Sequence, residues 1–503
     1  MMDFNNTNIR TSREKLLADP YRPAYHFVVP DGDEVISPND PNGAFYADGL
    51  YHLMYLYRNS VTDGHHWGHM VSKDLLHFRH LPDALGVHEG DMGCFSGGAF
   101  VDEDKTAYLS FWKLFRKDTD THGVALACAK PPYVHWERVE PMVSVSGKDL
   151  GIQDVETDGK ILHLGSCDPS NIWKENGVYY IQLGNKPVLD KYGMGEDADP
   201  MYQGGWTELY RSKDLKHWEF LHRFYDLPCD GKNGWPDETE DAMCPQFLPL
   251  YDARENGNKT GKWIQLFISH NKGCQYFVGE WNNETFYPET HGRMSWRDIT
   301  YFAPEALIDD RNRMILWTWL KDNLEPAIER FGWRGVYALP RILWWEENTL
   351  RMAPAEELET LQYNHQSFTK AGKLPVKNGE TFRLHAVFDT GEGAVVRVRE
   401  SADGTEFTEI YYDADAKALV VDTTHSGTEG DMKGKESAPF VLQEGEELNL
   451  DIFVDKSVVE VFANERQAIA RRIFPTKPET AIGVTLLTDA KVDVWEMMPT
   501  NPY

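Results

Sequence analysis

The sequence has few positive charges and no long hydrophobic run. Its 503 residues carry 51 Lys and Arg against 80 Asp and Glu, a formal charge of −29. Binding to nucleic acid requires clustered cations that compensate the phosphate charge, so this balance argues against a nucleic-acid partner and favours neutral or cationic ligands. A stretch of about 18 apolar residues is missing, which argues against a membrane-spanning helix. The polar segment Met1–Pro20 also lacks the apolar core of a secretory signal.

Cysteine is scarce and scattered. The six cysteines stand singly, without a CxxC pair. This spacing indicates neither a zinc site nor a disulfide framework. Together with the polar first residues, it predicts a soluble protein of the reducing cytoplasm that binds no metal ion.

Convincing helical periodicity is missing from the long segments, and short apolar and aromatic runs take its place. Examples are LYHLMYLY (Leu50–Tyr57), AYLSFWKLF (Ala107–Phe115) and WIQLFIS (Trp263–Ser269), separated by Gly, Asn and Asp. Such runs predict an all-β architecture. Aromatic residues make up 13% of the chain, a content typical of β-rich folds and of sites that hold sugar rings.

Three similar segments recur along the first part of the chain. They are SKDLLHF (Ser72–Phe78), AKPPYVHW (Ala129–Trp136) and SKDLKHW (Ser212–Trp218), and each ends in His followed by or near an aromatic residue. Recurrence of this kind favours repeated supersecondary units, as in the blades of a β-propeller. The alternative is that Ser-Lys-Asp-Leu is an ordinary turn sequence.

The character of the chain changes after the segment Met352–Gln362, which indicates a domain boundary. A short helical pattern is followed by strictly alternating strands such as FRLHAVFD (Phe382–Asp389), a pattern that suits a β-sandwich. We therefore expect a first domain at 1–355, a linker with a short helix at 356–368 and a C-terminal β-sandwich at 369–503.

Asp40 is the first candidate for chemistry. It stands in the turn sequence Ser37–Gly43, SPNDPNG, directly before the first strand run. Asn, Pro and Gly at such positions fix a tight turn that can position a carboxylate accurately. Retaining cleavage of a glycosidic bond needs two carboxyl groups roughly 5 Å apart, one a nucleophile and one a general acid. Taken alone, the segment is also explained by ordinary turn chemistry.

A longer series of segments resembles glycoside hydrolase family 32, whose members cleave β-fructofuranosyl bonds. The resemblance follows the order of the family's motifs and covers nearly the whole chain. The segments are RPAYHF (Arg22–Phe27), NDPNG (Asn39–Gly43), the run His65–Leu85, CFSGGAFVD (Cys94–Asp102), YFVGEW (Tyr276–Trp281), FYPE (Phe286–Glu289), YFAPEAL (Tyr301–Leu307), GWRGVYALPR (Gly332–Arg341), VDKSVVEVFAN (Val454–Asn464) and RRIFP (Arg471–Pro475).

The resemblance implies a fold and a set of site residues. The fold is a five-bladed β-propeller followed by a C-terminal β-sandwich. Asp40 matches the family nucleophile, and Asp168 in Cys167-Asp168-Pro169 matches the carboxylate that stabilises the transition state. Without the family context, Asp168 is explained as a turn-capping residue. The positions that match the fructose subsite are Asn39, Trp67, Phe95 and Ser96.

The general acid departs from the family pattern. The family has Glu directly before Cys-Pro, whereas this sequence has Met243 before Cys244, and methionine cannot donate a proton. Acidic residues lie just upstream, and side chains two apart on a strand share a face, so Asp241 would point like Met243. Glu240 reaches further but needs a bulge to face inward. Both stay candidates for the acid, beside the alternative of a solvated acidic loop.

Cys167 is the second departure, because the family has an Arg beside the stabilising Asp. Loss of a planar cation with five donors must change how the sugar is recognised. By its place in the motif Cys167 belongs to the substrate-binding set, although a lone thiol is more typical of a packing residue. Leu56 also replaces a usual Gln, and a displaced cation at Arg58 is one conceivable substitute for the missing Arg.

Together these observations predict a retaining glycosidase that acts on β-fructofuranosides such as sucrose or fructans, without a cofactor. Two alternatives stay open. One is a fructosyltransferase, which would use the same residues, and the other is a carbohydrate-binding protein that has lost its acid at Met243. We expect the C-terminal sandwich to brace the propeller or to mediate contacts in a homo-oligomer.

Overall fold

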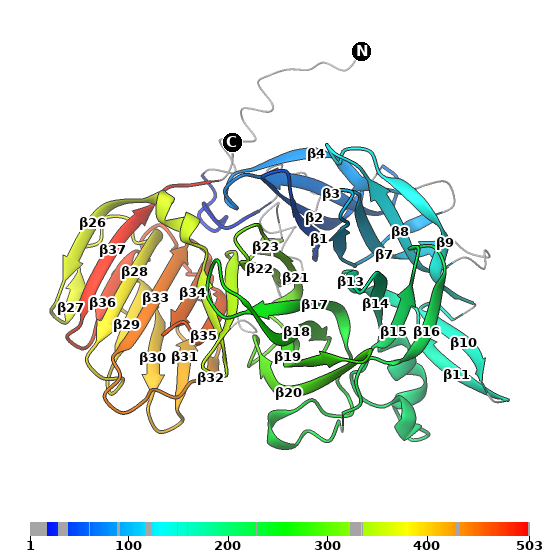
Figure 1. Ribbon diagram of the computed structural model, residues 1–503. Helices are drawn as coiled ribbons and strands as arrows, with labels where there is room; N and C mark the ends of the chain where they lie inside the picture. Colours follow the sequence, from blue (N-terminus) through cyan, green and yellow to red (C-terminus); the bar gives the residue numbers. More distant parts are fainter. Residues whose placement is uncertain are drawn as a thin grey trace, which may run out of the picture. The chain divides into compact units, whose positions relative to one another are not determined.

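The computed structural model describes most of the chain, and strands dominate it (Figure 1). The described residues are 18–28, 39–59, 61–87, 91–115, 122–147, 149–157, 159–227, 229–321, 333, 335–427 and 433–500. The helices in these ranges are short, such as α2 (Lys186–Val188) and the 3₁₀ helix η4 (Glu356–Leu361). The prediction of an all-β protein is therefore confirmed. Contacts divide the chain into two compact units, Pro38–Trp319 and Met1–Ser37 with Leu320–Tyr503.

The unit Pro38–Trp319 consists of mainly antiparallel sheets that follow one another along the chain. The first sheet contains β1 (Pro41–Ala47), β2 (Leu50–Asn59), β3 (Gly64–Ser72), β4 (Phe78–Leu85), β5 (Asp91–Cys94), β6 (Ala99–Val101), β7 (Ala107–Phe115), β8 (His122–Ala129) and β9 (Glu137–Ser146). A hairpin of β10 (Ile152–Thr157) and β11 (Lys160–Gly165) comes next. The next sheet contains β12 (Cys167–Pro169), β13 (Trp173–Glu175), β14 (Val178–Gly184), β15 (Glu208–Ser212) and β16 (Trp218–Arg223). Then come β17 (Met243–Tyr251), β18 (Lys259–Ser269), β19 (Gly273–Asn282) and β20 (Thr285–Arg293), and lastly β21 (Tyr301–Ile308) and β22 (Met314–Leu320).

The inner strands of these sheets contact one another in a closed cycle. β1 contacts β6 and β21, β12 contacts β7 and β17, and β17 contacts β21, while β6 pairs with β7. Figure 1 shows β1, β13, β17 and β21 toward the middle of this unit. The buried carboxyl of Glu305 in β21 joins the two ends of the cycle, because it accepts the backbone N–H of Ala44 in β1 at 2.6 Å. The sheets of this unit thus surround a common centre.

Aromatic side chains fill the space between neighbouring sheets of the ring. Trp173 of β13 lies with its ring centroid 4.9 Å from that of Phe247 in β17 and 5.5 Å from that of Trp281 in β19. Phe224, which follows β16, lies 4.8 Å from Phe247. Such large rings bury much apolar surface per residue, which explains the high aromatic content of the sequence.

The recurrent Ser-Lys-Asp-Leu segments form the same turn in two different sheets. Asp74 joins β3 to β4 and Asp214 joins β15 to β16, and each accepts the backbone N–H groups two and three residues later. The imidazole of His77 lies 2.8 Å from Asp74, and that of His217 lies 2.7 Å from Asp214. The third copy, at 129–136, joins β8 to β9 with a turn built on Pro-Pro. The repeat therefore marks equivalent connections between neighbouring strands, two of them within the first sheet.

The other unit contains two six-stranded antiparallel sheets. One contains, in spatial order, β26 (Gln362–Phe368), β37 (Lys491–Met497), β28 (Thr381–Phe388), β33 (Leu448–Asp455), β34 (Val458–Ala463) and β35 (Gln467–Arg472). The other contains β27 (Gly372–Leu374), β36 (Gly483–Leu486), β29 (Val395–Glu400), β30 (Thr408–Asp413), β31 (Ala418–Asp422) and β32 (Lys435–Pro439). The hairpin of β24 (Arg341–Glu346) and β25 (Thr349–Pro354) and the short strand β23 (Val336–Tyr337) precede them. Residues 362–368, expected in a linker, thus form a strand.

A buried acid at the end of β33 holds the segment near the start of the chain. Asp455 accepts the backbone N–H groups of Ala24, Tyr25 and His26 at 2.6 to 2.8 Å, and it lies 2.9 Å from His26 Nδ1. His26 Nε2 lies 3.2 Å from Glu460. One carboxylate therefore satisfies three consecutive backbone donors that burial would otherwise leave unpaired.

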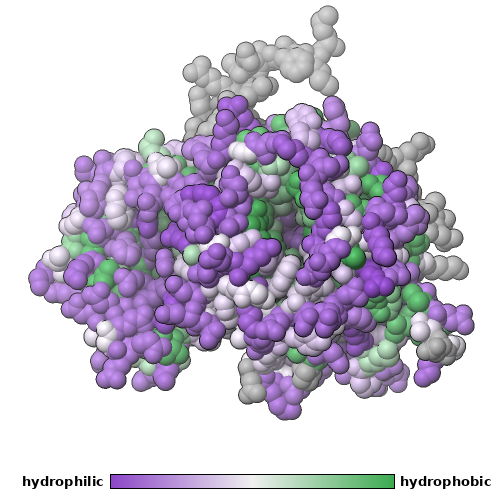
Figure 2. All heavy atoms as spheres, in the orientation of Figure 1, coloured by the Kyte–Doolittle hydropathy of each residue, from purple (hydrophilic) through white to green (hydrophobic). Residues whose placement is uncertain are grey.

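The visible surface is largely hydrophilic, with hydrophobic side chains in small separate patches (Figure 2). This distribution agrees with the high content of charged residues, which is 26% of the chain. None of the helices in the described ranges has the length and apolar character needed to cross a bilayer.

Candidate active site

Asp40 lies directly before β1, where hydrogen bonds to β2 fix its backbone. The N–H of Asn39 donates to the carbonyl oxygen of Leu56 at 2.8 Å, and the N–H of Leu56 donates to the carbonyl oxygen of Asp40 at 2.9 Å. The hydroxyl of Ser96 donates to Asp40 Oδ2 at 2.6 Å. A carboxylate held through both its backbone and its side chain keeps a defined direction, as a nucleophile requires.

Trp67 supports this turn from the protein interior. Gly43 has a left-handed φ of 56°, and a Cβ atom there would lie only 2.9 Å from the Trp67 ring. Trp67 is fully buried, and its indole N–H donates to the carbonyl oxygen of Phe95 at 3.2 Å. Asn39 and Phe95 keep some exposed surface. The predicted contact of Trp67 with substrate stays a prediction, because its observed role is packing.

Asp168 approaches Asp40 from a different sheet. It lies in β12 at a break in register between Cys167 and Pro169, with a left-handed φ of 30°. Such irregularities turn a side chain away from the regular alternation of a strand and are frequent beside active sites. The side chain of Asp168 is almost fully buried, with 7% of the residue exposed.

The thiol of Cys244 lies between the two carboxylates. Its Sγ atom is 3.8 Å from Asp40 Oδ2 and 3.5 Å from Asp168 Oδ2. Cys244 has a left-handed φ of 48° and lies at a register shift near the start of β17. The two acids therefore converge on one sulfur atom, as the sequence-based hypothesis of a shared site requires.

Burial and mutual repulsion dominate the electrostatics of this cluster. Burial raises the pKa of Asp168 to about 7, and the negative charge of Asp40 adds to the effect. The charge of His270 and the hydrogen bond from Cys244 act in the opposite direction. Burial, followed by the charges of Asp168 and Asp40, raises the pKa of the Cys244 thiol well above its ordinary value, so Cys244 remains a neutral donor.

Glu240 points away from these carboxylates. Its Oε1 and Oε2 atoms accept two hydrogen bonds from the guanidinium of Arg293, at 2.7 and 2.9 Å. The amide of Gln275 donates to Oε2 at 2.9 Å, and the N–H of Asp237 donates to Oε1 at 3.2 Å. Both oxygens of this buried side chain are thus occupied by a bidentate ion pair.

Asp241 faces the site instead. Its Oδ1 accepts the backbone N–H of His270 at 2.9 Å, and its Oδ2 lies 2.8 Å from His270 Nδ1. The charge of Asp241 contributes to the raised pKa of both Asp168, after burial and Asp40, and Cys167, after burial, Asp168 and Glu208. Of the two acids considered for proton transfer, the structure brings Asp241 to the cluster.

The two positions that depart from the family pattern contact each other. Cys167 Sγ lies 3.8 Å from Met243 Sδ and donates to the carbonyl oxygen of Gly184 at 3.2 Å. Cys167 is fully buried, and burial raises the pKa of its thiol well above the ordinary value. The predicted substrate contact of Cys167 stays a prediction, since its observed partners are protein atoms.

Arg58 does not replace the missing cation. Its guanidinium donates to Asp63 at 2.5 Å, and both side chains are about two-thirds exposed. The pair lies at the β2–β3 connection, and neither residue contributes to the pKa of Asp168. The arginine expected beside Asp168 thus has no substitute at this position.

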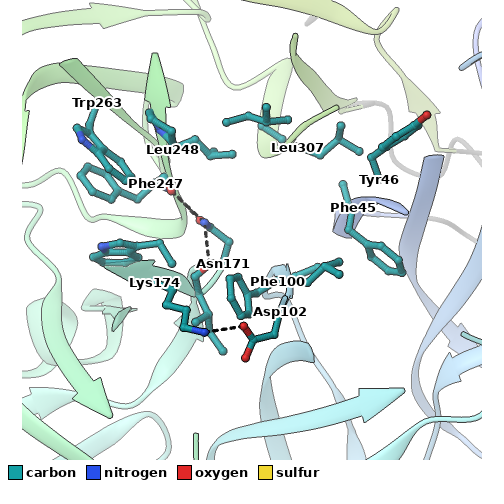
Figure 3. A pocket seen from close by; sticks show the side chains of 18 of the residues that line it. Phe45, Tyr46, Phe100, Asp102, Asn171, Lys174, Phe247, Leu248, Trp263 and Leu307 are labelled. Atoms are coloured by element: carbon teal, nitrogen blue, oxygen red, sulfur yellow. Dashed lines mark hydrogen bonds and ion pairs between the residues drawn. The ribbon is translucent and has the colours of Figure 1, made fainter. Parts of the chain in front are cut away.

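A separate cavity of about 680 Å³ lies at the opposite ends of the same inner strands (Figure 3). Phe45, Asn171, Phe247 and Leu307 line it. The first three of these follow Asp40, Asp168 and Cys244, respectively, by three or more residues along the chain. Strands rise about 3.3 Å per residue, so this distance separates the two regions. Asp40 and Asp168 are not part of its wall.

Two residues at the site do not stand out in the sequence. Cys244 is marked only as part of a motif, and no local pattern singles out His270. The pairing of Met243 with Ile268 places 241 opposite 270, so a correct register for β17 and β18 would have indicated the Asp–His contact. In the described part of the chain, no group of three His, Cys, Asp or Glu side chains is arranged to hold a metal ion.

Acids from separate sheets that converge at one end of a ring of strands are typical of a glycoside hydrolase. The chain belongs to glycosyl hydrolases family 32: residues 35–354 match the family's N-terminal domain and residues 348–496 its C-terminal domain. It is a glycosidase.

Curated relatives and solved structures agree with this assignment. The chain is 28% identical to a sucrose-6-phosphate hydrolase of Zymomonas mobilis, over 92% of this chain and 89% of that protein. It is 28% identical to a levanase of Bacillus subtilis, over 91% of this chain and 67% of that protein. The crystal structure of fructan 1-exohydrolase IIa from Cichorium intybus superposes with a TM-score of 0.78, at 21% identity, over 95% of this chain and 98% of that one.

Proposed function

We propose that the protein hydrolyses β-fructofuranosides with retention of configuration. The observation that carries the proposal is the pair of acids, Asp40 and Asp168, that share the thiol of Cys244. The printed names of the relatives, which include a levanase and a sucrose-6-phosphate hydrolase, support a fructosyl substrate.

The fold that we propose for this function is a five-bladed β-propeller followed by a β-sandwich. The closed cycle of inner strands supports the propeller. In this reading, β1–β4, β6–β9, β12–β16 and β17–β20 form successive blades, and β21 and β22 belong to the fifth. The two six-stranded sheets of the other unit support the sandwich.

In the first half of the reaction, Asp40 attacks the anomeric carbon and the bond to the leaving oxygen breaks. The hydrogen bond from Ser96 orients the attacking carboxylate. Once Asp40 becomes an ester, its negative charge disappears. Because that charge helps to raise the pKa of Asp168, its decrease as the new bond forms lets Asp168 release its proton to water more readily, and the resulting carboxylate stabilises the positive charge that the sugar carries in the transition states on either side of the ester.

Proton transfer to the leaving oxygen depends on the Asp241 side of the site. Glu240 has both oxygens held by Arg293 and Gln275, whereas Asp241 lies within electrostatic reach of Asp168. Met243 stands where the family has its general acid, and its sulfur atom contacts the sulfur atom of Cys167. We therefore place the proton-transfer step on the Asp241 side of the site and not at Glu240.

Among fructosides, we propose that neutral sugars are preferred over phosphorylated ones. The net charge of −29 repels a phosphate dianion. The arginine that could offer bidentate hydrogen bonds beside Asp168 is replaced by Cys167, which removes one cation from the site.

Product analysis tests the proposed function. Purified protein is incubated with sucrose, inulin and levan, and released fructose is measured. We expect turnover of at least one of them by the wild type and loss of about 10⁴-fold or more in Asp40→Asn, since the amide cannot form the ester. Asp154→Asn, an exposed Asp on β10 that pairs with His163, is the matched control and should keep full activity. Equal turnover by wild type and Asp40→Asn would remove Asp40 from the mechanism.

A carbohydrate-binding protein without catalysis would give a different result. It would bind fructosides with no release of fructose, even from an aryl fructoside whose leaving group needs little protonation. A fructosyltransferase would yield longer oligosaccharides in place of free fructose at high sucrose concentration.

A further inference from the structure

The Asp241–His270 pair lies beside the start of β17 and the end of β18, at the end of these strands that is nearer to the carboxylates of Asp40 and Asp168. Asp241 lies two residues before the start of β17, and His270 directly follows β18. Asp241 binds both the backbone N–H and Nδ1 of His270, at 2.9 and 2.8 Å. Because the carboxylate accepts a hydrogen bond from the backbone N–H of His270 and contacts Nδ1 of the same residue, the ring orientation is fixed and Nε2 is turned away from Asp241.

The two members of the pair differ in exposure. The side chain of Asp241 is 4% exposed, whereas that of His270 is 43% exposed. Among the described residues, no hydrogen-bond partner is found for Nε2 of His270. The ring of Phe302 meets the imidazole edge-on at a centroid distance of 5.8 Å and limits its movement. The imidazole is thus anchored on one side and open on the other.

Electrostatics link the imidazole to Asp168, because the charge of His270 lowers the pKa of Asp168 and opposes the effects of burial and of Asp40. Met243 has no proton to give, the oxygens of Glu240 are held by Arg293, and Asp241 is itself occupied by His270. Besides Asp168 and the thiol of Cys244, the imidazole of His270 is the group beside the carboxylates that can exchange a proton, through its open Nε2.

We propose that His270, oriented by Asp241, is the general acid and base of the reaction. The inference rests on the proposed retaining hydrolysis and assigns its proton-transfer group. When Asp40 bonds to the anomeric carbon, the electron pair of the breaking bond moves to the leaving oxygen, which takes the proton from Nε2 of the imidazolium. The neutral imidazole then takes a proton from water, whose oxygen attacks the anomeric carbon and releases Asp40. Each proton is returned, so no other reactant is needed.

Asp241 acts as a positioning residue in this scheme. A carboxylate on Nδ1 holds the imidazole in one tautomer and stabilises the imidazolium, as in an Asp–His pair of a hydrolytic triad. The pair provides at 241 and 270 what the family's Glu would have provided at 243.

Leaving-group dependence tests the assignment. His270→Gln is compared with wild type on sucrose and on 4-nitrophenyl β-D-fructofuranoside. We expect kcat/KM on sucrose to fall by roughly 10²–10⁴-fold and kcat/KM on the aryl fructoside to change by less than about tenfold, because nitrophenolate leaves without a proton. Azide should raise kcat of the variant on the aryl substrate and yield fructosyl azide. Since both substrates are measured on one protein, partial loss of folded enzyme cancels in the ratio.

A second His–Asp pair provides the matched control. His163 lies 2.7 Å from Asp154 on the β10–β11 hairpin. His163→Gln should change neither kcat/KM on the two substrates nor the ratio of the two values. In Asp241→Asn, removal of the negative charge beside the imidazolium should move the basic limb of the kcat/KM profile on sucrose to lower pH. The charged groups that face His270 are Asp241 and Asp168, and a merely structural role of Asp241 would leave that limb in place.

The outcomes separate the two proposals. Absence of fructose release by the wild type from sucrose, inulin, levan and the aryl fructoside overturns the proposed function and the inference with it. Turnover by the wild type, with an equal loss on both substrates in His270→Gln and no azide product, overturns the inference alone. A large loss of kcat/KM on sucrose without a matching loss on the aryl fructoside in Glu240→Gln would instead assign the general acid to Glu240.

Discussion

Cys244 places a neutral thiol between Asp40 and Asp168, two acids whose charges repel each other. Because burial and both carboxylates oppose its ionisation, the thiol stays protonated and acts as a donor. Its hydrogen bond lowers the pKa of Asp168 and so partly offsets that repulsion. Cys244 thereby keeps Asp168 within the range where it can change its charge during turnover.

Replacement of Cys244 tests this role. In Cys244→Ala, Asp168 loses a donor, so its pKa should rise above about 7, and the acid limb of the kcat/KM profile should move to higher pH. Cys244→Ser keeps a hydroxyl donor and serves as the control, with a smaller displacement or none. An unchanged acid limb in the alanine variant would contradict the role of the thiol.

Asp168 should make stability depend on pH. Its carboxyl binds a proton more tightly in the folded protein than in the unfolded chain, where its ordinary pKa is 3.8. The resulting stabilisation is complete below pH 3.8 and is lost as the pH rises through about 7. Asp168→Asn, which cannot ionise, should therefore raise Tm more at pH 8 than at pH 4, as measured by calorimetry. A Tm change independent of pH would contradict the raised pKa.

The sequence could identify some site residues and not others for a physical reason. Asp40 and Asp168 stand next to Pro in recognisable motifs, so their roles followed from the resemblance. His270 gains its role only from the partner across the strand pair, which a single strand does not reveal. Glu240 and Asp241 could not be separated, because the choice depends on where the chain leaves regular alternation.

At the level of elements, the inner strands break their register beside the site residues. The breaks lie between Asn42 and Phe45 in β1, between Cys167 and Pro169 in β12, and between Met243 and Gln246 in β17. A bulge turns a side chain to the face of the sheet opposite to the one that strict alternation would give it. The alternation of residues along the sequence therefore predicts where these strands lie, but it does not predict which way these side chains point.

Gly43 tests the first of these breaks. It has a φ of 56°, and an added Cβ would meet the Trp67 ring at 2.9 Å and Leu109 at 3.0 Å. Gly43→Ala should lower the free energy of unfolding by roughly 1–3 kcal/mol and also reduce kcat/KM, since the turn carries Asp40. Denaturant titration and sucrose turnover check the two effects, with Gly49→Ala as a control for the backbone conformation alone, because its Cβ would meet open space. Equal effects of the two substitutions would contradict a contribution from the Trp67 contact.

Asp455 at the end of β33 supports a separate prediction about stability. It accepts three consecutive backbone N–H groups and the imidazole of His26. Asp455→Ala should cost roughly 3–5 kcal/mol, the usual penalty when one partner of a buried ionic network is removed. Urea unfolding would measure the change, and a loss below about 1 kcal/mol would contradict the anchoring role.

At the level of the whole molecule, the net charge of −29 should act on substrate choice. A field of this sign repels a phosphorylated fructoside and leaves a neutral one unaffected. We therefore expect kcat/KM for sucrose 6-phosphate to rise as ionic strength increases from about 20 to about 200 mM, with no such change for sucrose. Initial rates at several salt concentrations check this. A fall with salt for the phosphorylated sugar would indicate a local cationic site.

The all-β class and the repeated turns could be predicted from the sequence because both depend on local patterns. The expected domain boundary near residues 355–368 stays a prediction. Contacts divide the chain at Trp319 and Leu320, whereas the family's N-terminal domain matches up to residue 354. Local periodicity cannot decide such a boundary, because β24 and β25 have the same alternating pattern as the strands on either side.

The sulfur contact between Cys167 and Met243 also constrains how this protein could return to the arrangement of its relatives. Glutamate at 243 alone would bring a further anion into a buried place that already holds Asp168, whereas arginine at 167 alone would stand beside Asp168, Glu208 and Asp241, whose charges already act on Cys167. An additional buried anion without a counter-ion is strongly destabilising, while arginine and glutamate together can form a pair. Reversion is therefore ordered, because the arginine has to be in place before a glutamate at 243 can be accommodated.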